Sequence, residues 1–266
     1  WLVAVRMLMA GVLMLGFVAL RTPRDLFTIW TNRADALRMI VFGLFGMLAV
    51  QYTYFAAINA SNAATATVIQ YTGPVLIVGW FAFQKKRWPT PFELLCVVMA
   101  IAGTFFMVTH GSLSSLSISP MALVWGLSSA AALAFYSIQP LTLMSRYASP
   151  IVIGWGMLIG GLALGFVHAP WAVEGVWDAP AIGAFAFIIV FGTLIPFYAY
   201  LTAVRIVGPE TSSLLACAEP LASAILAMAW LGTRFGMYDW LGTALILATV
   251  ITLSLRKQEP VPVKIE

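Results

Sequence analysis

The sequence predicts an all-α integral membrane protein built from two inverted repeats of five helices each. Hydrophobic residues make up 62% of the 266-residue chain and charged residues only 9%, which leaves too little polar surface for a soluble globular protein. The stretch Phe45–Pro74 also returns without a gap at Phe191–Pro220, 146 residues later, and both copies end on a proline inside an apolar span. A duplicated membrane unit with matched broken helices is the usual architecture of a transporter.

Runs of about twenty apolar residues are expected to be helices, because hydrocarbon offers an unpaired backbone group no hydrogen-bond partner. Nine such runs can be drawn, each ending near a charge, a proline or a cluster of Ser, Asn and Gly. In chain order the expected spans are Trp1–Leu20, Leu37–Ile58, Ala63–Phe83, Phe92–Thr109, Pro120–Leu143, Pro150–Val167, Ala179–Val204, Thr211–Leu231 and Tyr238–Leu255.

Polar segments separate these spans. The first span runs into Arg21, the third into the basic loop Gln84–Arg87, and the fourth into the uncharged loop His110–Ser119. In the second half, Arg146 follows the fifth span and Asp178 precedes the seventh. We therefore expect each of these segments to lie at the membrane surface.

The basic residues predict the orientation, since Lys and Arg accumulate in cytoplasmic loops. When alternate connections are assigned to one side, that side collects twelve of the fourteen basic residues, and the opposite side keeps only Arg234 and Arg6. Arg6 lies inside the first span, where we expect it to snorkel to the outer interface. The basic side and the C-terminus are thus predicted to be cytoplasmic, in the inner membrane of a cell; its residues are Arg21, Arg24, Arg33, Arg38, Lys85, Lys86, Arg87, Arg146, Arg205, Arg256, Lys257 and Lys264.

The repeat predicts the domain organisation. Residues 1–111 form the first repeat, residues 120–257 the second, and residues 258–266 a cytoplasmic tail. The 146-residue shift places the counterpart of Pro120–Leu143 before residue 1, so we expect ten spans in the complete protein, with the first helix missing here. An odd number of spans per repeat gives the two repeats opposite orientations.

Glu219 is the ionisable residue at a span centre, where charge is costly and usually marks function. Its counterpart in the first repeat is Gly73, so the fold of the repeat does not itself require the acid. Two interpretations stay open. Glu219 either titrates a proton or pairs with a substrate amine, or its carboxyl caps backbone that Pro220 leaves unpaired.

A central cavity with aromatic walls and few charges is predicted around the matched prolines. Trp125, Ser129, Ala132, Tyr136 and Gln139 recur on one helical face, and such a face avoids lipid. No Lys or Arg lies at a span centre to hold phosphorylated cargo. The candidate substrate-binding residues are Tyr52, Gln70, Tyr71, Pro74, Trp125, Ser129, Tyr136, Tyr198, Glu219 and Pro220, with Glu219 as the candidate for proton coupling.

The stretch Ser61–Thr67 leading to Gly73–Pro74, the stretch Ser212–Leu215 leading to Glu219–Pro220, and the basic loop Gln84–Arg87 carry a family resemblance. In them the chain resembles the EamA-type transporters of the drug/metabolite transporter superfamily. The resemblance implies export of small organic metabolites such as amino acids, amines and drug-like compounds, and the bacterial exporters of aromatic amino acids belong to this family.

We therefore expect a carrier that exports small metabolites, amino acids including aromatic ones, by alternating access. A drug or organic-cation efflux carrier is the alternative, and a channel or facilitator is a further one. No enzyme is expected, because the spans hold no paired aspartates, no Ser/His couple and no His-Glu-x-x-His. The expected partners are a small-molecule substrate and lipid, with no nucleic acid, cofactor or metal, and a monomer is compatible with the sequence.

Overall fold

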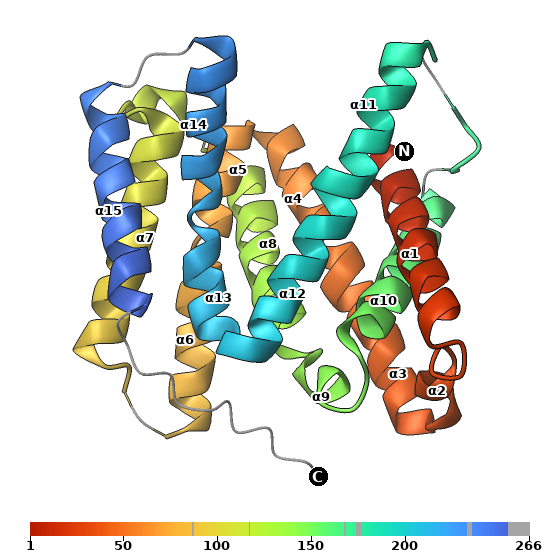
Figure 1. Ribbon diagram of the computed structural model, residues 1–266. Coiled ribbons are helices and arrows are strands. Elements are labelled where there is room, and N and C mark those ends of the chain that lie inside the picture. Colours follow the sequence, from red (N-terminus) through yellow and green to blue (C-terminus); the bar gives the residue numbers. More distant parts are fainter. Residues whose placement is uncertain (87, 117, 168, 174–176, 233–235, 255–266) are drawn as a thin grey trace. The chain divides into compact units, whose positions relative to one another are not determined.

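The computed structural model describes residues 1–86, 88–116, 118–167, 169–173, 177–232 and 236–254. Every regular element within these ranges is a helix (Figure 1). Several residues named above lie outside these ranges: Arg87, Arg234, Leu255, Arg256, Lys257, Lys264 and the tail 258–266.

The described chain forms two compact units that are interleaved in sequence. The first unit comprises residues 1–51 and 135–206, and the second comprises residues 52–134 and 207–254. Each unit therefore contains helices from both halves of the chain.

The first unit is organised around the contact between α1 (Leu2–Arg21) and α10 (Ser149–Val167). The two backbones approach closely at glycines. A Cβ at Gly161 would lie 3.0 Å from the backbone nitrogen of Leu8, and one at Gly160 would lie 3.0 Å from the carbonyl oxygen of Gly43. The small residues of this span thus pack against other helices of the same chain. The other helices of the unit are α2 (Thr28–Thr31), α3 (Arg33–Val41), α9 (Leu141–Met144), α11 (Ala179–Ile189) and α12 (Ile195–Val207).

Two π-helical turns, which no sequence pattern predicted, interrupt the first unit. They are η1 (Phe42–Leu48) and η3 (Val190–Leu194). In η3 the hydroxyl of Thr193 donates to the carbonyl of Ile188, 3.0 Å away. Wide turns of this kind are frequent at functional sites.

The second unit pairs α7 (Pro91–Thr109) with α15 (Met237–Ser254), where a Cβ at Gly242 would lie 2.8 Å from the carbonyl oxygen of Gly103. A buried apolar cluster joins Cys96 and Ala100 of α7 to Leu214. The other helices of this unit are most of α4 (Ala49–Ala60), most of α8 (Pro120–Ile138), the 3-10 turn η2 (Leu113–Ser115), α5 (Ala63–Gln70), α6 (Gly73–Gln84), α13 (Pro209–Ala216) and α14 (Glu219–Leu231).

Eight helical segments of the described chain are long and apolar enough to cross a membrane, against nine expected. The ninth expected span is helical as α15, but its apolar part, Met237–Thr252, is shorter. The second span begins at Arg33 rather than Leu37, because the Asn32 side chain caps the helix by accepting from the backbone nitrogens of Ala34 and Asp35.

The 146-residue offset recurs in the element bounds. Helix α5 (Ala63–Gln70) corresponds to α13 (Pro209–Ala216), and α6, beginning at Gly73, corresponds to α14, beginning at Glu219. Both expected breaks near mid-span are present.

Candidate substrate-binding site

Each break in the second unit ends one short helix and starts another at a proline. Helix α6 carries Pro74 in its first turn, and α14 carries Pro220. Proline has no amide hydrogen, so Pro220 cannot donate to the carbonyl of Ala216, four residues earlier. That carbonyl must find another donor.

The donor is Tyr71. Its hydroxyl lies 3.2 Å from the carbonyl oxygen of Ala216 and 3.2 Å from Oε2 of Glu219, so one hydroxyl hydrogen serves two acceptors. The Tyr71 side chain is buried in the apolar cluster that includes Leu214. The Ala216 carbonyl therefore has a donor in Tyr71, and Glu219 shares that donor.

Glu219 itself is exposed, although it lies in the first turn of α14. The N-terminus of a helix favours negative charge because its first amide groups point outward. One oxygen of the Glu219 side chain thus contacts the Tyr71 hydroxyl, and the residue is otherwise exposed.

Four other candidate residues pair within the second unit. Nε2 of Gln70 donates to Oγ of Ser129 over 2.7 Å, which links α5 to α8. The rings of Tyr52 and Trp125 meet edge to face with centroids 5.8 Å apart. Tyr54, which the sequence analysis did not select, shares a 2.8 Å hydrogen bond with Thr67.

Tyr136 and Tyr198 belong to the first unit. Tyr136 is buried and stacks on Tyr200 and Phe42, with centroids 5.6 Å and 6.0 Å away. Tyr198 is 40% exposed. Of the ten candidate substrate-binding residues, eight lie in the second unit and two in the first.

Arg6, which we expect to reach the outer interface, is hydrogen bonded within the first unit. Nη2 donates to Oε1 of Gln51 over 2.7 Å, and Nη1 lies 3.4 Å from Oγ1 of Thr193. Removing a charged guanidinium group from water costs free energy. Hydrogen bonds to these polar side chains offset that cost. Neither Gln51 nor Thr193 was selected from sequence, because they lie 45 and 187 residues from Arg6 and no local pattern links them.

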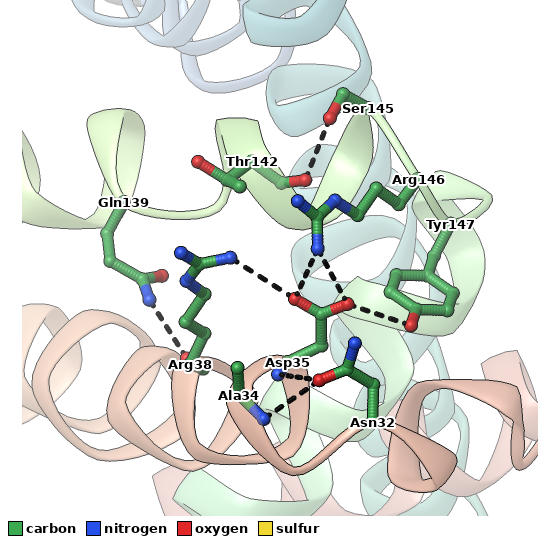
Figure 2. Close-up of polar contacts among 9 residues, drawn as sticks. All are labelled: Asn32, Ala34, Asp35, Arg38, Gln139, Thr142, Ser145, Arg146 and Tyr147. Carbon is green, nitrogen blue, oxygen red and sulfur yellow. Dashed lines mark hydrogen bonds and ion pairs between the residues drawn. The ribbon is translucent and has the colours of Figure 1, made fainter. Parts of the chain in front are cut away.

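A second polar cluster missed from sequence lies in the first unit (Figure 2). The carboxylate of Asp35, 2% exposed, accepts from Nη1 of Arg146 at 3.1 and 3.2 Å, and from the hydroxyl of Tyr147 at 3.0 Å. Nη1 of Arg38 lies 3.3 Å from the same carboxylate. We call Asp35, Arg38, Arg146 and Tyr147 the Asp35 cluster. The sequence feature that could have indicated this cluster is Asp35 itself, an isolated acidic residue among basic residues near the end of a span.

Within the described residues, no group of three or more His, Cys, Asp or Glu side chains could hold a metal ion. His110, at the end of α7, instead pairs with Asp239, with Nδ1 and Oδ1 2.6 Å apart. The candidate site is therefore organised by carboxylate, hydroxyl, amide and aromatic groups.

Comparison with known proteins decides the family. The sequence profile of the EamA-like transporter family matches residues 1–109 and 120–255. The chain belongs to the EamA-like transporter family. It is accordingly a membrane transporter and not an enzyme, as the sequence analysis predicts.

Relatives extend this EamA assignment. The chain is 42% identical to the uncharacterized inner membrane transporter YicL of Salmonella typhimurium, over 96% of this chain and 85% of that one. It is 22% identical to the threonine/homoserine exporter RhtA of Escherichia coli, over 86% of this chain and 75% of that one. The protein is thus an inner-membrane, multi-pass transporter.

A solved crystal structure shares the fold of this EamA protein. Its TM-score to the chain is 0.79 at 19% sequence identity, and the match covers 96% of this chain and 86% of that one. The likeness confirms the all-helical architecture.

Proposed function

We propose that this EamA transporter exports small amine-bearing metabolites, amino acids including aromatic ones, by alternating access. The observation that carries the proposal is the exposed Glu219 carboxylate beside Tyr71 at the helix break of the second unit. An ammonium group is the natural partner of a carboxylate held at this depth in a membrane protein.

The geometry leaves room for that partner. Oε2 of Glu219 accepts from Tyr71, whereas Oε1 has no hydrogen-bond partner among the described residues. A carboxylate offers about four lone-pair positions, so an ammonium can add hydrogen bonds without displacing Tyr71. The aromatic pair of Tyr52 and Trp125 in the same unit supports a preference for substrates with an apolar or aromatic side chain.

The repeated element bounds support the inverted-repeat architecture that this mechanism needs. We propose two oppositely oriented five-helix repeats, ten spans in the complete protein, with the C-terminus in the cytoplasm. Glu219 is the group that would carry a proton if export is coupled to a proton gradient.

Organic-cation efflux is the second candidate, and one observation favours it. The described Lys and Arg residues of the second unit are Lys85 and Lys86, both beyond the end of α6. The candidate site in that unit thus contains an anion for an amine but no cation for an amino-acid carboxylate. The distant relationship to a threonine/homoserine exporter supports the amino-acid assignment instead.

Binding measurements on purified protein separate these possibilities. Labelled phenylalanine, threonine and a quaternary ammonium compound would be titrated against the parent and Glu219→Gln. A charge-assisted hydrogen bond contributes about 1.5 to 3 kcal/mol, so we expect the variant to bind the preferred amine about ten- to a hundred-fold more weakly. Asp25→Asn removes a carboxylate from an exposed loop and is the matched control.

Equal affinity of Glu219→Gln and parent for every amine would contradict the proposal. Selective binding of the quaternary compound would favour cation efflux. Uptake into vesicles adds the coupling test: Glu219→Gln should remove any dependence on a pH gradient, and coupling that persists in the variant would exclude Glu219 as the proton carrier.

A further inference from the structure

The Asp35 cluster lies where three apolar helices end. Asp35 and Arg38 occupy the first turns of the segment Arg33–Ala60. Arg146 and Tyr147 lie in the connection between Pro120–Met144 and Ser149–Val167. The ends of helices of this length reach the interface between hydrocarbon and water. The cluster is therefore at the depth of lipid headgroups, on the side that the basic residues predict to be cytoplasmic.

The cluster carries one net positive charge. Two guanidinium groups share a single carboxylate, and Tyr147 is neutral at physiological pH. Burial, followed by the hydrogen bond to Asp35, raises the pKa of the Tyr147 phenol above its ordinary value of 10.0. The arginine side chains remain partly accessible, with 42% of Arg38 and 29% of Arg146 exposed.

The local structure fixes these arginines before any ligand arrives. The buried carboxylate of Asp35 holds both guanidinium groups, and the side chain of Asn32 caps the helix that carries it (Figure 2). Nε2 of Gln139 donates to the backbone carbonyl of Arg38 over 2.9 Å. Side chains held in this way lose less conformational freedom on binding an anion.

The apolar neighbours of Arg38 indicate what kind of anion fits. Leu37 is 63% exposed and Ile40 is 40% exposed on the same helix. Exposed apolar side chains of a membrane helix contact acyl chains. A ligand that meets both surfaces has acyl chains joined to an anionic head, because guanidinium groups prefer the oxygens of a phosphate.

We propose that the Asp35 cluster is a binding site for the phosphate of an anionic phospholipid. Arg38 and Arg146 bind the headgroup oxygens, Asp35 positions the two guanidinium groups, and Leu37 and Ile40 contact the acyl chains. This inference is independent of the transported substrate.

The test measures lipid binding to the full chain in detergent by native mass spectrometry. Phosphatidylglycerol is titrated in parallel with neutral phosphatidylcholine. Arg38→Gln removes the net charge but leaves the buried pair of Asp35 with Arg146 intact. One basic residue near an anionic surface contributes about 1 kcal/mol, so we expect phosphatidylglycerol to bind about five-fold more weakly.

Two further variants make the result specific. Arg38→Lys keeps the charge and should retain most of the affinity. Lys85→Gln removes the same charge from the end of α6, in the other unit, and should bind phosphatidylglycerol like the parent. Thermal unfolding in phosphatidylcholine checks that each variant is folded.

The proposal is overturned if Arg38→Gln binds phosphatidylglycerol like the parent, or if Lys85→Gln loses as much affinity as Arg38→Gln. Millimolar inorganic phosphate is added as a competitor. Full displacement of the lipid by phosphate would identify a site for free anions and would equally overturn the assignment to lipid.

Discussion

Tyr71 joins the two helix breaks of the second unit through one hydroxyl. It satisfies the carbonyl of Ala216, which Pro220 leaves without its helical donor, and it holds Oε2 of Glu219. The same hydroxyl thus stabilises the break and orients the carboxylate that we propose to bind substrate. Loss of this hydroxyl should affect both stability and transport.

Replacement of Tyr71 by Phe tests this dual role. The variant leaves the partly buried carbonyl of Ala216 without this donor, and an unpaired buried polar group costs about 1 to 3 kcal/mol. We expect a lower unfolding temperature in detergent and weaker binding of the transported amine. Tyr54→Phe is the control, because among the described residues the Tyr54 hydroxyl pairs with another hydroxyl, that of Thr67. Interhelical hydrogen bonds in membranes average about 0.6 kcal/mol. Equal unfolding temperatures for the two variants would contradict the role of Tyr71.

Some residue-level features could be predicted from sequence and others could not. Glu219 and the matched prolines could be identified because an ionisable residue or a proline is unusual inside an apolar span. The hydrogen bond from Tyr71 to the carbonyl of Ala216 could not be predicted, because 145 residues separate the two. Asp35 and Arg146 are 111 residues apart. Pairing over such distances leaves no local pattern in one sequence.

At the scale of elements, close helix contact depends on glycines that face a neighbouring backbone. Helices α1 and α10 meet at Gly161, where an added Cβ would lie 2.9 Å from Cγ of Leu8 and 3.0 Å from its backbone nitrogen. A larger side chain there must push the two helices apart, because backbone atoms cannot move aside as a flexible side chain does.

The substitution Gly161→Leu measures that contact. Overpacking of a tightly packed contact costs about 1 to 3 kcal/mol, so we expect a lower temperature of thermal unfolding in detergent. Gly16→Leu is the matched control on α1, because nothing lies within 4 Å of a Cβ at that position. A Gly161→Leu protein as stable as Gly16→Leu would show that α1 and α10 do not pack closely here.

The positions of the helices could be predicted well from the sequence, but the irregular turns inside them could not. Helix ends agree where a proline, a charge or a polar cap sets the boundary, as at Asn32. The π turns η1 and η3 were missed, because a shifted hydrogen-bond register inside a continuous apolar run changes no composition. The broken helices were found because proline marks both breaks.

At the scale of the whole molecule, composition and the internal repeat were sufficient for the class of protein. The high hydrophobic content and the twice-matched family profile lead to the same membrane transporter. The interleaving of the two compact units was not predictable, because each unit draws helices from both halves of the chain. Contact between distant segments, rather than sequence order, defines these units.

The most direct test of the proposed function is counterflow in proteoliposomes. Vesicles containing the purified protein are loaded with unlabelled amine, first threonine and phenylalanine, and then exposed to a trace of the labelled compound. A carrier should accumulate label transiently and with saturation, and Glu219→Gln should lose this exchange while Asp25→Asn keeps it. A channel would give neither trans-stimulation nor saturation, and exchange by Glu219→Gln at the rate of the parent would contradict the central role of that carboxylate.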